Sequence, residues 1–167
     1  MRHHLPWESD VQKWFRNGDA LADANTDSSH DGRLLLGMDR ERLAACASHA
    51  RLRNPGIETP LRKEIGFDGP IRNLKAVAVA CADRGQGGTI ADQVMEDVLY
   101  DIQNREAGES TLVVSRINKS NKASERFAVR NGFGLLEDIP DPDDERSWFL
   151  LLNQVPAADV EKPLVAA

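Results

Sequence analysis

Residues 74–90 read LKAVAVACADRGQGGTI, and this stretch limits the possible folds more than any other part of the chain. Its first eight residues, 74–81, are a nearly continuous apolar run of strand length, which predicts a buried central strand. Three glycines follow within four positions, at Gly85, Gly87 and Gly88. Apolar residues at helical spacing begin directly after them. The stretch therefore predicts a strand, a glycine turn and a helix in direct succession.

A glycine turn between a buried strand and a helix is suited to binding a phosphate. Glycines let the backbone approach an anion. The N–H groups of the loop and of the first helical turn point at one spot, where the helix dipole is positive. We expect Thr89 to cap the helix and Arg84 to add a positive charge at the rim. The competing interpretation is a turn that only joins the strand to the helix. The predicted phosphate loop comprises Arg84, Gly85, Gln86, Gly87, Gly88 and Thr89.

Three phosphate motifs compete for this loop. A P-loop requires a lysine after its last glycine, and none follows here. A dinucleotide fingerprint fits at Gly85 and Gly87, but its third glycine position is Ile90. The third pattern, Arg/Gln-x-x-Gly-x-Gly/Ala, matches from Arg84 onward, with Thr89 as the small residue in last place.

The first half of the chain is predicted to consist mainly of strands. Residues 7–24 have helical spacing and 25–32 form a loop by composition. Two strands, 33–39 and 43–52, are joined by a polar turn. Residues 53–73, rich in proline and glycine, are expected to form a long connection with one short helical turn at 60–65.

The second half alternates strands and helices. After the glycine loop and its helix, 110–117 reads as a strand, and 121–133 as a short helix that ends at an Asn-Gly cap. The final strand is expected at 147–154, and residues 155–167 look like a disordered tail. One domain over residues 1–154 follows, of mixed α/β (α+β) class, with helices packed on a mixed sheet.

Composition excludes several classes of function. The net charge of −6 argues against nucleic acid as a partner, because phosphate binding needs a basic face. No apolar run approaches the ~18 residues that would span a membrane. Two cysteines, Cys46 and Cys81, fit a reducing, cytoplasmic compartment and form no metal-binding motif. We expect no metal.

The second half resembles the GCN5-related N-acetyltransferase (GNAT) superfamily. The loop AVACADRGQGGT is similar to that family's acyl-CoA pyrophosphate loop, with Val79 five residues before the arginine. NKASERFAVRNGF is similar to its second motif: Asn121, a small residue at Ser124, and Gly-Phe eleven and twelve residues after the asparagine. The resemblance extends over about residues 33–153.

This resemblance implies a GNAT-like fold, with a mostly antiparallel sheet splayed at the middle and helices on both faces. It implies that acetyl-CoA is the co-substrate and that an amine attacks the thioester directly. Backbone groups of Val77, Ala78 and Val79 would pair with the pantetheine arm, and Asn121 would contact it from across the cleft. Ser124 would contact the cofactor or relay a proton.

The chain departs from the family pattern in two places. Many members have a tyrosine seven residues after that asparagine, as the acid for the leaving thiolate, whereas this chain has Ala128. The chain also opens with HHLPWESD and a helical pattern, so the family's first strand is absent, displaced to about residues 1–6, or unrecognisable. Asp83 is a candidate base acting through water. His49 is a weaker candidate, on a strand face that the sequence does not determine.

Three functional hypotheses follow. The first is an acyl-CoA-dependent N-acetyltransferase with a small-molecule or protein amine as acceptor. The chain could also form a homodimer. The acidic run 138–145 would draw a cationic acceptor. The second, motivated by Ala128, is a non-catalytic or regulatory acyl-CoA-binding module. The third is an unrelated phosphate- or nucleotide-binding fold.

Overall fold

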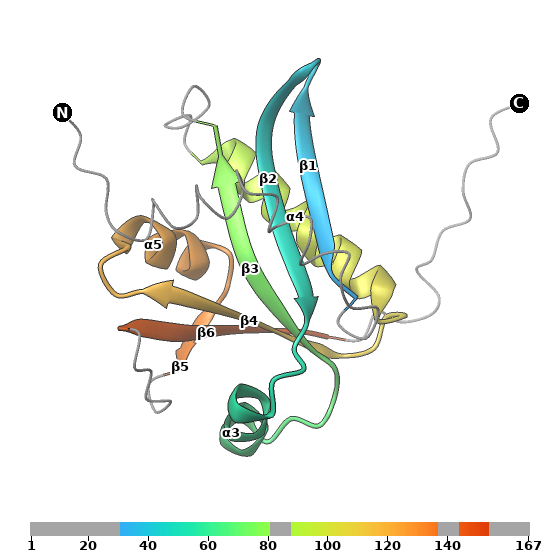
Figure 1. Cartoon of the computed structure of the whole chain (residues 1–167), viewed down its shortest axis with the longest axis vertical. Coiled ribbons are helices and arrows are strands. Elements are labelled where there is room, and N and C mark those ends of the chain that lie inside the picture. The colour runs from blue at the N-terminus through green and yellow to red at the C-terminus, as the bar shows by residue number, and fades with distance from the viewer. Residues whose placement is uncertain (1–30, 81–87, 137–143, 154–167) are drawn as a thin grey trace, which may run out of the picture.

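The computed structural model describes residues 31–80, 88–136 and 144–153. Within these ranges six strands form one sheet in the order β1-β2-β3-β4-β6-β5, and three helices pack against it (Figure 1). Every neighbouring pair is antiparallel except β3 and β4. The predicted mixed, mostly antiparallel sheet is confirmed. Residues 1–30, including the predicted helix over 7–24, lie outside the described residues.

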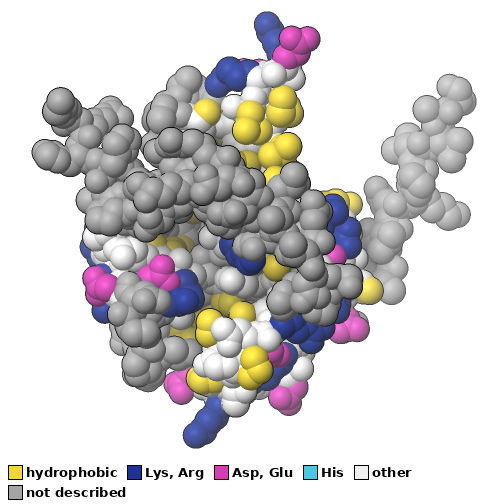
Figure 2. All heavy atoms as spheres, viewed as in Figure 1, with side chains coloured by type: hydrophobic (Ala, Val, Ile, Leu, Met, Phe, Trp, Pro, Cys, Tyr) yellow, Lys and Arg dark blue, Asp and Glu magenta, His cyan; other side chains and the backbone are white. Residues whose placement is uncertain are grey.

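The first two strands form the predicted hairpin. β1 (Arg33–Asp39) pairs with β2 (Arg42–Arg51) from Arg33 opposite His49 to Asp39 opposite Arg42. Near the hairpin tip, hydrophobic side chains gather on the surface (Figure 2). They are Leu36, Met38 and Leu43, which are 57%, 55% and 47% exposed.

The connection after β2 contains a helix, so the expectation of a single turn at 60–65 was wrong. α3 (Pro55–Ile65) begins after Asn54, whose side chain accepts a hydrogen bond from the Gly56 N–H at 3.0 Å. Proline directly after an asparagine cap is a favourable helix start. Pro60 lies inside the helix, where a proline removes one backbone hydrogen bond, and this made the segment look like a loop.

β3 and β4 separate after a short parallel contact. β3 (Ile71–Val79) pairs with β4 (Thr111–Asn118) only from Ile71 opposite Leu112 to Asn73 opposite Val114. At the next position, the Ser115 hydroxyl donates to the Leu74 carbonyl at 3.1 Å. Beyond it the described strands no longer pair, so the implied splay of the sheet is confirmed.

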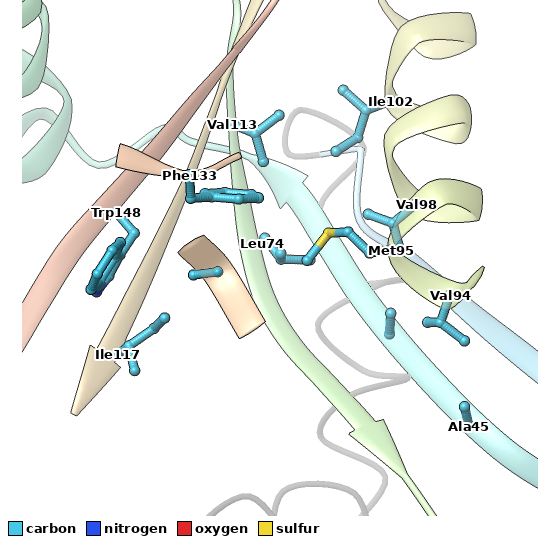
Figure 3. Packing of buried hydrophobic residues seen from close by; sticks show 12 residues of the cluster. Ala45, Leu74, Val94, Met95, Val98, Ile102, Val113, Ile117, Phe133 and Trp148 are labelled. Carbon is cyan, nitrogen blue, oxygen red and sulfur yellow. The ribbon is translucent and has the colours of Figure 1, made fainter. Parts of the chain in front are cut away.

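Helices cover both faces of the sheet, as expected. α4 (Thr89–Arg105) and α5 (Lys122–Arg130) contribute to the larger hydrophobic cluster on one face, which Figure 3 shows. Side chains alternate between the two faces along β4. Val113 therefore packs in this cluster, and its neighbours Leu112 and Val114 pack in a second cluster with α3. Successive side chains of one strand therefore anchor the two layers.

The chain after β4 follows the predicted order. α5 ends in the cap expected at Asn131-Gly132, because Gly132 has a φ of +83°. The Phe133 N–H donates to the Ala128 carbonyl and the Gly132 N–H to the Val129 carbonyl, both at 3.0 Å, the pattern of a Schellman motif. β5 (Gly134–Leu136) then pairs with β6 (Glu145–Leu152).

Candidate functional site

The predicted site residues divide between described and undescribed parts of the chain. Asp83, Arg84, Gly85, Gln86 and Gly87 lie outside the described residues. The structure describes the others at the ends of three elements that share one core: the end of β3, the start of α4 and the start of α5. These are Val77, Ala78, Val79, Gly88, Thr89, Asn121 and Ser124.

The end of β3 turns one row of backbone groups toward the opened side of the sheet. The Ala80 N–H donates to the Ala44 carbonyl of β2 at 2.8 Å, so the backbone groups of Ala80 face β2. Since backbone groups alternate sides along a strand, those of Ala78 also face β2, whereas those of Val77 and Val79 face away from it. No described strand pairs with β3 on that side beyond Asn73. An extended ligand carrying amides can pair with the backbone of Val77 there as an added strand.

The start of α4 points the positive end of its dipole toward the same region. Its N-cap is Gly88 and not Thr89, so the expected side-chain cap was wrong. Gly88 has a φ of +84°, which favours glycine because a Cβ is strained there. The first helical bond runs from the Asp92 N–H to the Gly88 carbonyl at 2.9 Å. The N–H groups of the first turn, which come before that of Asp92, therefore lie at the open end of the helix, where an anion is favoured.

Arg130 also lies at this end of α4, which the sequence did not reveal. A Cβ built on Gly88 would lie 2.5 Å from Arg130 Nη2, so the guanidinium sits directly against the α4 N-cap. Arg130 also bonds to Asp92 in the first turn of α4. Since 38 residues separate the partners, no local pattern reports the contact. The one local signal was a basic residue just before the Asn-Gly cap.

Asn121 caps α5. Its side-chain oxygen accepts a hydrogen bond from the Ser124 N–H at 3.1 Å, and the residue is 9% exposed. This contact leaves the two amide hydrogens of the side chain for another partner. Asn121 therefore has a structural role whether or not it contacts a ligand, and Ser124 lies in the same first turn.

Ala128 lies in the hydrophobic core. It is 4% exposed and belongs to the cluster that contains Leu74, Val113 and Phe133. A tyrosine here would insert a ring into packed space, which typically costs about 1–3 kcal/mol. The one tyrosine of the chain, Tyr100, lies on α4 and is 68% exposed. The alanine thus completes the packing between α5 and the sheet.

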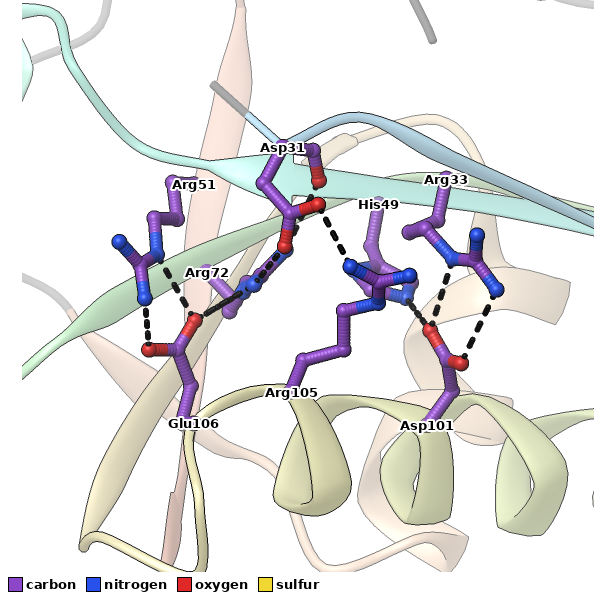
Figure 4. Close-up of polar contacts among 8 residues, drawn as sticks. All are labelled: Asp31, Arg33, His49, Arg51, Arg72, Asp101, Arg105 and Glu106. Carbon is purple, nitrogen blue, oxygen red and sulfur yellow. Dashed lines mark hydrogen bonds and ion pairs between the residues drawn. The ribbon is translucent and has the colours of Figure 1, made fainter. Parts of the chain in front are cut away.

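A charged network joins the C-terminal end of α4 to the sheet (Figure 4). The fully buried Arg72 donates to Glu106 at 2.6 Å, and Arg51 bonds to the same carboxylate at 3.0 and 2.6 Å. Asp31 accepts a further bond from Arg72 at 2.5 Å. Burial would raise the pKa of Glu106, but the bonds from Arg51 and Arg72 outweigh it and lower that pKa. The network is a structural clamp at the end of α4 opposite to Gly88.

His49 lies in a second polar cluster beside this network and faces α4, which settles the face that the sequence left open (Figure 4). Its Nε2 lies 2.9 Å from Asp101, and Arg33 bonds to the same carboxylate at 3.4 Å. Burial lowers the pKa of His49 to about 4 despite the neighbouring carboxylate. The side chain is fully buried, so it offers no accessible base.

Comparisons with known proteins identify the fold. No protein-family model and no curated protein matches the sequence. An acetyltransferase of the GNAT family from Desulfovibrio desulfuricans has a TM-score of 0.58 at 16% identity, covering 90% of this chain and 84% of that one. The fold is that of the GNAT superfamily. A Bacillus subtilis acetyltransferase in complex with CoA gives 0.56 at 13% identity, covering 82% and 85%.

A third GNAT-fold neighbour is the ribosomal-protein-alanine N-acetyltransferase from Brucella melitensis, with a TM-score of 0.52 at 16% identity, covering 86% of this chain and 78% of that one. Within the described residues, no three His, Cys, Asp or Glu side chains are grouped so as to hold a metal ion. None of the helices in the described ranges is long and apolar enough to cross a membrane.

Proposed function

We propose that this protein is an acyl-CoA-dependent N-acyltransferase that transfers acetyl from acetyl-CoA to an amine. The observation that carries the proposal is the splay of β3 from β4 beside the N-terminal end of α4. That arrangement offers strand-like hydrogen bonding for the pantetheine amides and a helix end for the pyrophosphate. Gly88 fits this arrangement, because it has no Cβ and the guanidinium of Arg130 can lie directly against its backbone.

The reaction proposed is direct attack. The amine lone pair forms a C–N bond to the thioester carbonyl carbon, the C–S bond breaks, and the thiolate leaves with the electron pair. The amine loses one proton to a base, and the thiolate gains one. A backbone N–H at the end of β3 near Val77 would stabilise the carbonyl oxygen as its charge develops.

Two residues are proposed for the proton transfers. Asp83 is proposed as a base acting through water and Ser124 as a relay to the thiolate. A thiol has a pKa near ~8.5, so the thiolate can leave with modest help. The acceptor is proposed to be a primary amine, in keeping with the amine chemistry in the Brucella neighbour's name.

A non-catalytic acyl-CoA-binding module is the second candidate. The buried Ala128 favours it, because the tyrosine that the resemblance implied has no counterpart and Tyr100 is distant in sequence on the exposed side of α4. Such a module would bind acetyl-CoA without forming product. Binding and turnover therefore have to be measured separately.

Acetyl-CoA is expected to raise the melting temperature. A ligand at about 100 times its dissociation constant stabilises the folded state by ~2.7 kcal/mol. The measurement is a thermal shift with acetyl-CoA, with ATP and NAD as controls, followed by free-CoA release across a panel of amines. A shift with NAD alone would contradict the proposal, and a shift without CoA release from any amine would support the non-catalytic module.

Substitutions of Asn121 are expected to separate its structural role from its proposed role in binding. Asn121→Ala should lower the free energy of unfolding by about 1 kcal/mol, because the α5 cap is lost. Asn121→Asp keeps a capping oxygen but removes the amide hydrogens, so it should retain stability and weaken acetyl-CoA binding. Calorimetric titration and chemical denaturation of both variants check this. Wild-type affinity in Asn121→Asp would reduce Asn121 to a helix cap.

A further inference from the structure

A single arginine bridges the two helices at the open end of the sheet. Arg130, in the last turn of α5, donates from Nε and Nη2 to one Asp92 oxygen at 3.0 and 2.8 Å. Its Nη1 and Nη2 lie 3.4 and 2.5 Å from a Cβ built on Gly88. The guanidinium therefore lies against the N-cap of α4.

Several contacts hold this guanidinium in one place although the side chain is 48% exposed. Asn131 donates to the same Asp92 oxygen at 3.1 Å and to the Phe127 carbonyl at 2.9 Å. The Phe127 ring lies 5.5 Å from the guanidinium carbon. The hydrogen bond from Arg130 lowers the pKa of Asp92, so this carboxylate is ionised at neutral pH.

The contacts to Asp92 leave donors for a second anion. A guanidinium has five N–H groups, and the two bonds use one on Nε and one on Nη2. Three others remain, one on Nη2 and two on Nη1, and these are the two nitrogens nearest to Gly88. The chain as a whole has a net charge of −6, so attraction for a polyanion must come from local cations.

We propose that Arg130 binds a phosphate group of CoA and that Asp92 is the positioning residue that holds its guanidinium at the α4 N-terminus. The proposal rests on the function proposed above and adds a residue to its site. Arginine suits the role because its planar fork bonds a phosphate through two parallel N–H groups. The shared chemistry is a phosphate, and both the pyrophosphate and the 3′-phosphate of CoA provide it.

The test compares Arg130→Gln with Arg105→Gln. Arg105 is a matched control, because it is 36% exposed, lies 3.0 Å from Asp31, and sits about 26 Å along α4 from the N-cap. Calorimetric titration gives dissociation constants for CoA, 3′-dephospho-CoA and S-acetylpantetheine, which lacks both phosphate sites. Arg130→Gln should weaken CoA about 10- to 100-fold, the usual effect of a charged hydrogen bond, and leave S-acetylpantetheine unchanged.

Comparing the three ligands identifies the phosphate group that Arg130 binds. It also separates this inference from the proposed function. An effect of Arg130→Gln that disappears with 3′-dephospho-CoA assigns Arg130 to the 3′-phosphate, and one that persists assigns it to the pyrophosphate. Equal CoA affinity in Arg130→Gln and Arg105→Gln would overturn the inference while the proposed function stands. Failure of the wild-type protein to bind any CoA thioester would overturn the function itself.

Two variants test the role of Asp92. Asp92→Asn keeps an oxygen acceptor for Arg130, so it should bind CoA as the wild-type protein does, whereas Asp92→Ala should weaken binding. In the Arg130→Gln background, Asp92→Ala should cause no additional loss, because the two residues act as one unit. Tighter binding by both Asp92 variants would show that the carboxylate only repels phosphate, and would overturn its positioning role.

Discussion

Glu106→Gln is expected to lower the free energy of unfolding by about 3–5 kcal/mol, the usual effect of removing one partner of a buried ion pair. Glu106 accepts from Arg51 and Arg72, and Arg72 is fully buried. The substitution keeps the shape of the side chain and removes its charge, so the Arg72 cation loses half of its compensation. Chemical denaturation at pH 7 measures the loss.

Glu109→Gln is the control, since Glu109 is exposed near the same end of α4. It should change stability by no more than about 0.5 kcal/mol. The double variant Glu106→Leu with Arg72→Met should be more stable than Glu106→Gln, because it buries no uncompensated cation. If Glu106→Gln matched Glu109→Gln, the network would have no part in holding α4 to the sheet.

Stability is expected to rise by about 3 kcal/mol between pH 4 and pH 6.5 through His49 alone. Burial lowers the pKa of His49 from 6.5 to about 4 in the folded state, so the unfolded chain binds the proton more strongly within this window. The contribution is complete above pH 6.5 and is lost as the pH falls toward 4. Asp101, Arg33 and Arg72 are the charged groups that face the imidazole.

The measurement is the free energy of unfolding against pH for the wild-type protein and His49→Gln. The glutamine can still donate to Asp101 but does not titrate, so its curve should be flatter between pH 4 and pH 6.5. The carboxylates of Asp31 and Glu106 have lowered pKa values, so their contribution is lost at still lower pH in both proteins. Parallel curves for the two proteins would show that His49 is not buried in its neutral form.

The sequence predicted most of the fold because the apolar pattern is local. The polar turn between β1 and β2, the apolar run of β3 and the spacing in α4 each depend on near neighbours along the chain. The helix over Pro55–Ile65 was missed because Pro60 reads as a helix breaker, although Pro55 and the Asn54 cap favour a start.

The site could be predicted only in part, because its geometry depends on contacts between distant segments. The glycines and Asn121 carry a local signal, and among the described ones Gly88 begins α4 and Asn121 begins α5. The contact of Arg130 with Gly88, the orientation of His49 and the burial of Ala128 depend on how α4 and α5 pack together. The cap at Gly88 was misassigned by one residue because its positive φ cannot be read from a run of glycines.

The short contact between β3 and β4 also bears on the entropy of association. Pairing stops at Asn73 and Val114, and the Ser115 hydroxyl bonds to the Leu74 carbonyl just beyond it. A linear ligand that lies along β3 there therefore displaces none of the described strands and breaks none of their ladders. Preorganisation of this kind leaves more of the gross interaction energy as affinity. Among the described residues, the length of β3 that no strand pairs with on this side is therefore set by where the three residue pairs end.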